Sequence, residues 1–361
     1  MRISSLSEDL SIEKRVSLTP EIAKKYISMG FEVSLPKNYS LHLGINDQTF
    51  KDLGVKIADE EELIFSSDIL IQLNLPKDEY LSKMKDNQSL VGVLNPFKNE
   101  NSLKMLSKKN INLFSLELLP RITRAQSMDI LSSQANLAGY KAVVESFSHF
   151  ERAIPMMMTA AGTVPAAKVL VVGAGVAGLQ AIATAKRMGA IVFATDVRLA
   201  SKEQVESLGG KFLIVEGAEN LETDGGYAKE ASEDFKKKQE NLLKETLKKI
   251  DIIICTALIP GKKAPIIIKK DMIEEMQAGS IIYDLAASQG GNTELTEVDD
   301  IVDFNGVKIM GETNILNKLP ATASSLYAKN MFNFISNLYD KDKKSLNINL
   351  EDEIISKTLI K

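Results

Sequence analysis

A glycine-rich turn is the feature of the sequence that most directly predicts chemistry. Gly173, Gly175 and Gly178 follow the apolar run 169–172 in the pattern G-x-G-x-x-G. Between a strand and a helix, the first glycine permits a tight turn, the second lets the backbone approach a pyrophosphate, and the third lets helix and strand pack closely. The N–H groups of the helix N-terminus then face the phosphates. The pattern therefore predicts a dinucleotide site.

An acidic residue completes this predicted site. Asp196 ends the next apolar run about 20 residues beyond the first glycine, where such folds place the carboxylate that binds the adenosine ribose. A carboxylate there favours NAD(H), because it repels the 2′-phosphate of NADP(H). Arg198 is an opposing signal, since a nearby arginine can accept that phosphate. Because Asp196 holds the ribose-facing position at the end of the strand, we expect the cofactor to be NAD(H).

The segment 120–136 is unusually rich in hydrogen-bonding side chains. If a helix starts near Gln126, then Gln126, Asp129, Ser133 and Asn136 recur on one face, with Ser132 beside them. Such a face is either solvated or forms the polar wall of a site for a nicotinamide carboxamide and ribose. The spacing alone leaves both interpretations open.

A long polar loop spans 217–230 and contains Gly225, Gly226 and Tyr227. Loops of this length in an α/β unit are usually functional lids or disordered. The aromatic ring of Tyr227 beside two glycines favours the lid.

The composition argues against several other kinds of chemistry. The 361 residues carry a net charge of -4, which gives no reason to expect nucleic acid as a partner. His42 and His149 lack ligand-forming neighbours, so we expect no metal site. Cys255 lies in an apolar run and is expected to be a buried strand residue. Without a signal peptide or an apolar run long enough to span a bilayer, a cytoplasmic location is expected.

An α/β scaffold is expected to position these residues. Apolar runs alternate with helical patterns, which is typical of parallel sheets covered by helices on both faces. The expected strands of the first unit are 31–35, 68–73, 89–94 and 111–116. The expected strands of the second unit are 168–172, 190–195, 211–215, 251–256, 280–285 and 307–310.

Two long helices are expected beside these strands. The segment 126–150 lacks proline and has Gly139 as its one glycine, and an amphipathic helix over 323–338 returns to the first unit. We therefore predict two Rossmann-like, doubly wound parallel-sheet domains joined by long helices. The first is a discontinuous α/β domain of residues 1–125 plus about 320–361. The second is an NAD(H)-binding Rossmann domain of residues 126–319, which includes the connecting helix.

Runs of residues across the chain resemble domain I of the proton-translocating NAD(P) transhydrogenases, which are related to alanine dehydrogenase. The resemblance covers essentially the whole chain and is densest from Glu117 to Gly291. The motifs that carry it are RITRAQSMDILSSQ at 121–134, MMMTAAGTVP at 156–165, ATDVR at 194–198, KEQVESLGGKF at 202–212, GGYAKE at 225–230 and TALIPG at 256–261.

The resemblance implies roles for individual residues. In that family the polar segment holds the nicotinamide end of NAD(H), which implies catalytic positions at Arg121, Gln126, Asp129 and Ser132. Tyr227 matches a tyrosine on a loop that closes over the nucleotide, whereas Ala231 departs from the family's methionine, so weaker closure is expected. The predicted cofactor-binding residues are Ile122, Thr123, Gly173, Gly175, Val176, Gly178, Asp196, Val197, Arg198, Gly226, Tyr227, Gln239 and Leu258.

The resemblance also implies an activity and partners. The family passes a hydride directly from NADH to NADP⁺ bound on a partner domain III, coupled to proton translocation by a membrane domain II. It implies a homodimer of this split, soluble type of subunit, cytoplasmic and peripheral to the inner membrane through its partners. Transfer between two nicotinamide rings needs proximity and orientation rather than a nucleophile, metal or general base.

Two other functions compete with this one. Alanine dehydrogenase shares the start of the chain, Glu13-Lys-Arg15-Val-Ser-Leu-Thr-Pro20. That family has a substrate-binding lysine and a catalytic histidine where this chain has Gln72 and Asn95, neither of which can supply the required proton. A non-catalytic NAD-binding module is the third possibility, and the residues expected to face the nicotinamide argue against it.

Overall fold

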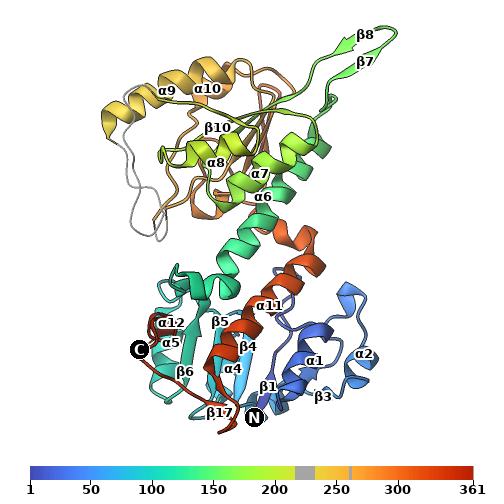
Figure 1. Ribbon diagram of the computed structural model, residues 1–361, viewed down its shortest axis with the longest axis vertical. Coiled ribbons are helices and arrows are strands. Elements are labelled where there is room, and N and C mark those ends of the chain that lie inside the picture. The colour runs from blue at the N-terminus through green and yellow to red at the C-terminus, as the bar shows by residue number, and fades with distance from the viewer. Residues whose placement is uncertain (216–231, 260–261, 361) are drawn as a thin grey trace. The chain divides into compact units, whose positions relative to one another are not determined.

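The computed structural model describes residues 1–215, 232–259 and 262–360. The chain forms two units, Met1–Gln134 with Leu316–Lys361, and Ala135–Ile315. Each unit is built on one seven-stranded sheet (Figure 1). Among the described residues, no helix combines the length and the apolar character needed to cross a bilayer.

The sheet of the first unit has the strand order β18-β6-β5-β4-β1-β2-β3. All neighbours are parallel except β18, which pairs antiparallel with β6. The core order β3-β2-β1-β4-β5-β6 is that of a dinucleotide-binding fold. Its strands are β1 (Arg2–Ser4), β2 (Glu32–Pro36), β3 (Lys56–Ala58), β4 (Ile69–Asn74), β5 (Ser89–Val93), β6 (Asn112–Ser115) and β18 (Leu359–Ile360). Its helices include α1 (Pro20–Ser28), α2 (Asp47–Lys51), α3 (Glu60–Ser66), α4 (Asp78–Lys83), α5 (Glu100–Ser107) and α12 (Glu353–Thr358).

Helix α11 (Pro320–Leu338) belongs to the first unit although it comes late in the chain. Tyr327, Met331 and Phe334 on its apolar face share one buried cluster with Val33 and Ile71 of the sheet. The segment after residue 315 therefore contributes to the core of the first unit rather than forming a tail.

The sheet of the second unit has the order β11-β10-β9-β12-β13-β15-β14. Strand β14 alone pairs antiparallel, with β15. The strands are β9 (Lys168–Val172), β10 (Ile191–Thr195), β11 (Lys211–Phe212), β12 (Ile252–Cys255), β13 (Ile281–Asp284), β14 (Ile301–Phe304) and β15 (Val307–Met310). The helices are α7 (Val176–Arg187), α8 (Ser201–Ser207), α9 (Glu233–Leu247) and α10 (Lys270–Glu274). Strands β7 (Met157–Thr159) and β8 (Gly162–Val164) form a separate hairpin that projects from this unit (Figure 1).

Helix α6 (Ile130–His149) begins later than the sequence predicts. Residues Thr123–Met128 form a 3₁₀ turn instead. The carboxylate of Asp129 accepts the Ser132 N–H at 2.9 Å, as an N-cap does, and this starts the helix after Asp129. The predicted helical face through Gln126 and Asp129 is therefore wrong.

Helix α6 also makes a close contact inside the second unit. A Cβ built at Gly139 would lie 2.0 Å from the carbonyl oxygen of Ala177, in the first turn of α7. Only glycine allows the two backbones to approach this closely.

Candidate functional site

The turn between β9 and α7 has different steric needs at its three glycines. Gly173 has φ +93°, and a Cβ at Gly178 would lie 1.9 Å from the Gly173 carbonyl oxygen. By contrast, a Cβ at Gly175 would meet no described atom within 4 Å, and φ -77°, ψ -167° suits any residue. The packing of the described chain thus requires glycine at 173 and 178 and leaves space at 175. That open space fits a pyrophosphate lying against the backbone.

A buried asparagine that the sequence analysis missed holds the loop after β12 near this turn. The Asn292 side chain is fully buried; its Oδ1 accepts the Ala257 N–H at 3.0 Å, and its Nδ2 donates to the carbonyl oxygens of Ala257 and Pro265 at 2.8 and 2.9 Å. The Thr256 hydroxyl donates to the Gly173 carbonyl oxygen at 2.9 Å. The loop that carries Leu258, which is 39% exposed, is therefore fixed to the glycine turn.

Asp196 follows β10 directly, and the structure pairs it with Arg198. The Arg198 Nε and Nη2 atoms donate to the two carboxylate oxygens at 2.9 and 2.7 Å. The N–H groups of Arg198 and Ala174 donate to the same carboxylate at 2.8 and 2.7 Å. Sequence reasoning weighs Asp196 against Arg198 as opposing signals, but the structure joins them, with Val197 between them in the same turn.

The polar segment before α6 forms a pocket of 260 Å³ within the first unit. The residues that line it are Pro120, Arg121, Ile122, Thr123, Ala125, Gln126, Asp129 and Ser132. The structure thus brings together all four predicted catalytic residues and two of the predicted cofactor-binding ones. The Ser132 hydroxyl donates to Asp129 at 2.5 Å, which orients both side chains. A convergent pocket favours the polar wall over the merely solvated face.

The pocket is held in place by helix α11. The side-chain amides of Asn330 and Asn333 both donate to the Ser127 carbonyl oxygen, at 2.8 and 2.9 Å. The Ser133 hydroxyl donates to Asn330 at 2.6 Å, so Ser133 faces α11 rather than the pocket. Asn136 instead donates to Gln180 at 3.3 Å, in the second unit.

The other predicted residues have different standings. Val176 is the first residue of α7, and Gln239 lies half-buried on α9. Gly226, Tyr227 and the departure at Ala231 lie outside the described residues.

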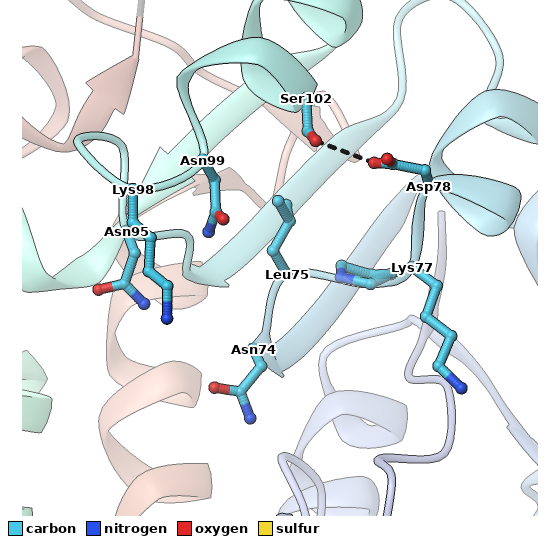
Figure 2. Close-up of a pocket in the computed structure, with 9 residues that line it drawn as sticks. Asn74, Leu75, Lys77, Asp78, Asn95, Lys98, Asn99 and Ser102 are labelled. Atoms are coloured by element: carbon cyan, nitrogen blue, oxygen red, sulfur yellow. Dashed lines mark hydrogen bonds between the residues drawn. The ribbon is translucent and has the colours of Figure 1, made fainter. Parts of the chain in front are cut away.

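Gln72 and Asn95, the positions that distinguish alanine dehydrogenase, lie on the carboxyl ends of β4 and β5. Gln72 is buried, and its Oε1 accepts the Ser5 hydroxyl at 2.9 Å and the Leu6 N–H at 2.7 Å. Asn95 lines an open pocket of 480 Å³ with Asn74, Lys98 and Asn99 (Figure 2). Both amides are non-titrating at the edge where substrates of open α/β sheets bind.

One titratable group near this edge has a perturbed pKa. Burial raises the pKa of Glu8 above its ordinary value of 4.5, although N–H groups of Leu73 and Asn74 and the Asn74 side chain donate to its carboxylate and partly oppose that shift. Within the described ranges, no cluster of three or more His, Cys, Asp or Glu residues could hold a metal ion.

Comparisons with known proteins agree on one family. The model of the alanine dehydrogenase/PNT N-terminal domain matches residues 6–138, and that of the C-terminal domain matches residues 142–361. The chain is 48% identical to an NAD(P) transhydrogenase alpha subunit of Rhodospirillum rubrum, covering 100% of this chain and 96% of the relative. The identity to the corresponding subunit of Rickettsia prowazekii is 46%, covering 100% and 94%.

Solved structures define the fold class. A transhydrogenase structure from Sinorhizobium meliloti matches with a TM-score of 0.88 and 40% identity, covering 99% of this chain and 98% of that one. An L-alanine dehydrogenase matches with a TM-score of 0.83 and 21% identity, covering 99% and 94%, which shows the shared fold alone. These matches define a protein of two Rossmann-like sheets, and the predicted fold class is confirmed.

The chain belongs to the family of NAD(P) transhydrogenase alpha subunits. The resemblance predicted from the motifs is thereby confirmed, as is the prediction of an oxidoreductase component. Membership of the wider alanine dehydrogenase/PNT family implies NAD(H) binding.

Proposed function

We propose that this chain is the NAD(H)-binding component of a proton-translocating transhydrogenase and passes a hydride from NADH to NADP⁺ bound on a partner domain III. The observation that carries the proposal is the open space at Gly175, in a turn whose other two glycines are required by packing. NAD(H) supplies the hydride; the chain supplies binding and orientation.

The residues divide this work. The glycine turn and the first turn of α7 would hold the pyrophosphate, and Asp196 would hold the adenosine ribose. Arg121, Gln126, Asp129 and Ser132 would hold the carboxamide and ribose of the nicotinamide end. Because Asp129 and Ser132 are already hydrogen-bonded to each other, the pocket is preorganised and needs little rearrangement to fix the ring.

The partners belong to the same proposal. A homodimer of this chain, a domain III that binds NADP(H) and a membrane domain II would complete the assembly, placing the chain in the cytoplasm at the inner membrane. The naming of relatives as alpha subunits supports partner subunits. Met156 and Met158 at the β7–β8 hairpin, 63% and 82% exposed, offer an apolar surface for self-association.

The deciding experiment mixes the purified chain with a domain III protein loaded with NADP⁺. We expect NADH oxidation and NADP⁺ reduction without a membrane, since direct transfer needs only two rings held about 3 to 3.5 Å apart. Stopped-flow absorbance with a spectrally shifted nicotinamide analogue measures the transfer. Alanine-dependent NADH formation by the chain alone, with no transfer to a domain III shown to bind it, would establish the alanine dehydrogenase activity instead. Tight NADH binding with neither reaction would establish a binding module.

A further inference from the structure

The carboxylate of Asp196 is saturated by the chain itself. It accepts four hydrogen bonds, of which three come from Arg198. A carboxylate offers about four acceptor positions, so a ribose diol must share or displace one of these bonds. The side chains of Asp196 and Arg198 are 5% and 15% exposed, which makes this a well-shielded pair rather than a surface contact.

The guanidinium of Arg198 is chemically suited to a second ligand. A planar arginine fork binds phosphate oxygens as well as it binds a carboxylate. Asp196 also binds the Ala174 N–H, so the pair sits directly beside the glycine turn. Arginine near this strand end is the group that receives the 2′-phosphate of NADP(H) in this type of fold.

We propose that Asp196 determines cofactor choice by holding Arg198, so that the arginine is withheld from a 2′-phosphate. The inference rests on the proposed NAD(H) site and goes further, because it assigns the discrimination to the pair rather than to the charge of Asp196. Removing the carboxylate charge while keeping Arg198 converts the same position into a 2′-phosphate site.

The test compares Asp196→Asn, Arg198→Ala and the double variant in calorimetric titrations with NADH, NADPH, 5′-AMP and 2′-AMP. For Asp196→Asn we expect affinity for NADPH and 2′-AMP to rise about tenfold or more, the effect of one hydrogen bond to a charged partner. The double variant should lose that gain. Arg198→Ala alone should bind NADPH less well than the parent chain, because the remaining carboxylate is no longer neutralised.

The outcomes separate the two proposals. If the unaltered chain binds no NADH, the proposed function fails. If it binds NADH but Asp196→Asn gains no affinity for 2′-AMP, the pair does not set the choice. A gain that persists in the double variant shows simple loss of repulsion and overturns the role of Arg198. A general folding defect would lower affinity for 5′-AMP and 2′-AMP alike, and far-UV circular dichroism identifies it, with Arg198→Ala remaining as the second test.

Discussion

Gln126 and Asp129 reach one pocket from two different backbone conformations. Gln126 lies in the 3₁₀ turn, whereas Asp129 is the residue that starts α6. Their positions depend on the buried side chains of Ala125 and Met128 and on the two amides of α11 that hold Ser127. The pocket is therefore built by packing, and its polar side chains can act on a ligand.

Gln126→Ala and Asp129→Ala should slow hydride transfer more than they weaken NADH binding. These side chains orient the ring while the glycine turn supplies most of the affinity, and a misplaced ring can cost up to about 100-fold in rate. Single-turnover rates with domain III and calorimetric dissociation constants measure the two effects. Ser133→Ala is the matched control, since Ser133 contacts α11. Unchanged rates with a raised dissociation constant would leave these residues an anchoring role only.

Glu8→Gln should stabilise the protein at neutral pH and have no such effect in acid. Burial raises the pKa of Glu8 in the folded state. The stability that its protonated form contributes is present below the ordinary value of 4.5 and is lost as the pH rises through the folded pKa. Glutamine keeps an acceptor for the Leu73 and Asn74 N–H groups without the buried charge.

Urea unfolding of the two proteins at several pH values measures this difference. The free energies of unfolding should diverge as the pH rises above 4.5. A constant difference across the whole range would show that the Glu8 charge does not destabilise the fold.

The glycine turn allows binding to be separated from folding at the scale of one element. Gly178→Ala places a Cβ 1.9 Å from the Gly173 carbonyl oxygen and should destabilise the protein by at least about 1–3 kcal/mol. Gly175→Ala meets no atom of the described residues, so it should fold as the parent does and lose NADH affinity. Thermal unfolding and NADH titration measure the two responses. If Gly175→Ala retained full NADH affinity, the pyrophosphate would not lie there.

Some elements could be predicted from sequence and others could not. Strands β9 and β15 coincide with their predicted runs because continuous burial gives a continuous apolar signal. Strand β14 was missed because this edge strand alternates exposed and half-buried residues. The start of α6 depends on the Asp129 cap, which the even polarity of 120–136 hides.

The candidate site shows the same division. Its residue types were predicted because glycines and a strand-end acid have local reasons to recur at fixed spacing. The Asp196–Arg198 pairing is a matter of side-chain geometry, which spacing does not specify. Asn292 was missed because its partners, Ala257 and Pro265, are distant in sequence, and only its place after Gly290 and Gly291 could have marked it.

At the scale of the whole molecule, the exposed hairpin leads to a prediction about assembly. Met158→Asp should weaken a homodimer by about tenfold or more if the hairpin tip is an apolar anchor of the interface. Sedimentation velocity over a range of concentrations measures the dimer constant. Val298→Asp is a matched control, because Val298 is also exposed, at 60%, but lies outside the hairpin. Equal dimer constants for both variants would place the interface elsewhere.

The close contact at Gly139 bears on how this chain would drift under relaxed selection. Any mutation at that codon introduces a side chain against the Ala177 carbonyl oxygen, whether or not a nucleotide ever binds. A lineage that kept the fold but abandoned its cofactor would therefore retain glycine at 139 and 178. The codon for Gly175 would be free to wander, since only a ligand penalises a side chain there. Residue 175 would thus record the loss of the nucleotide long before the fold did.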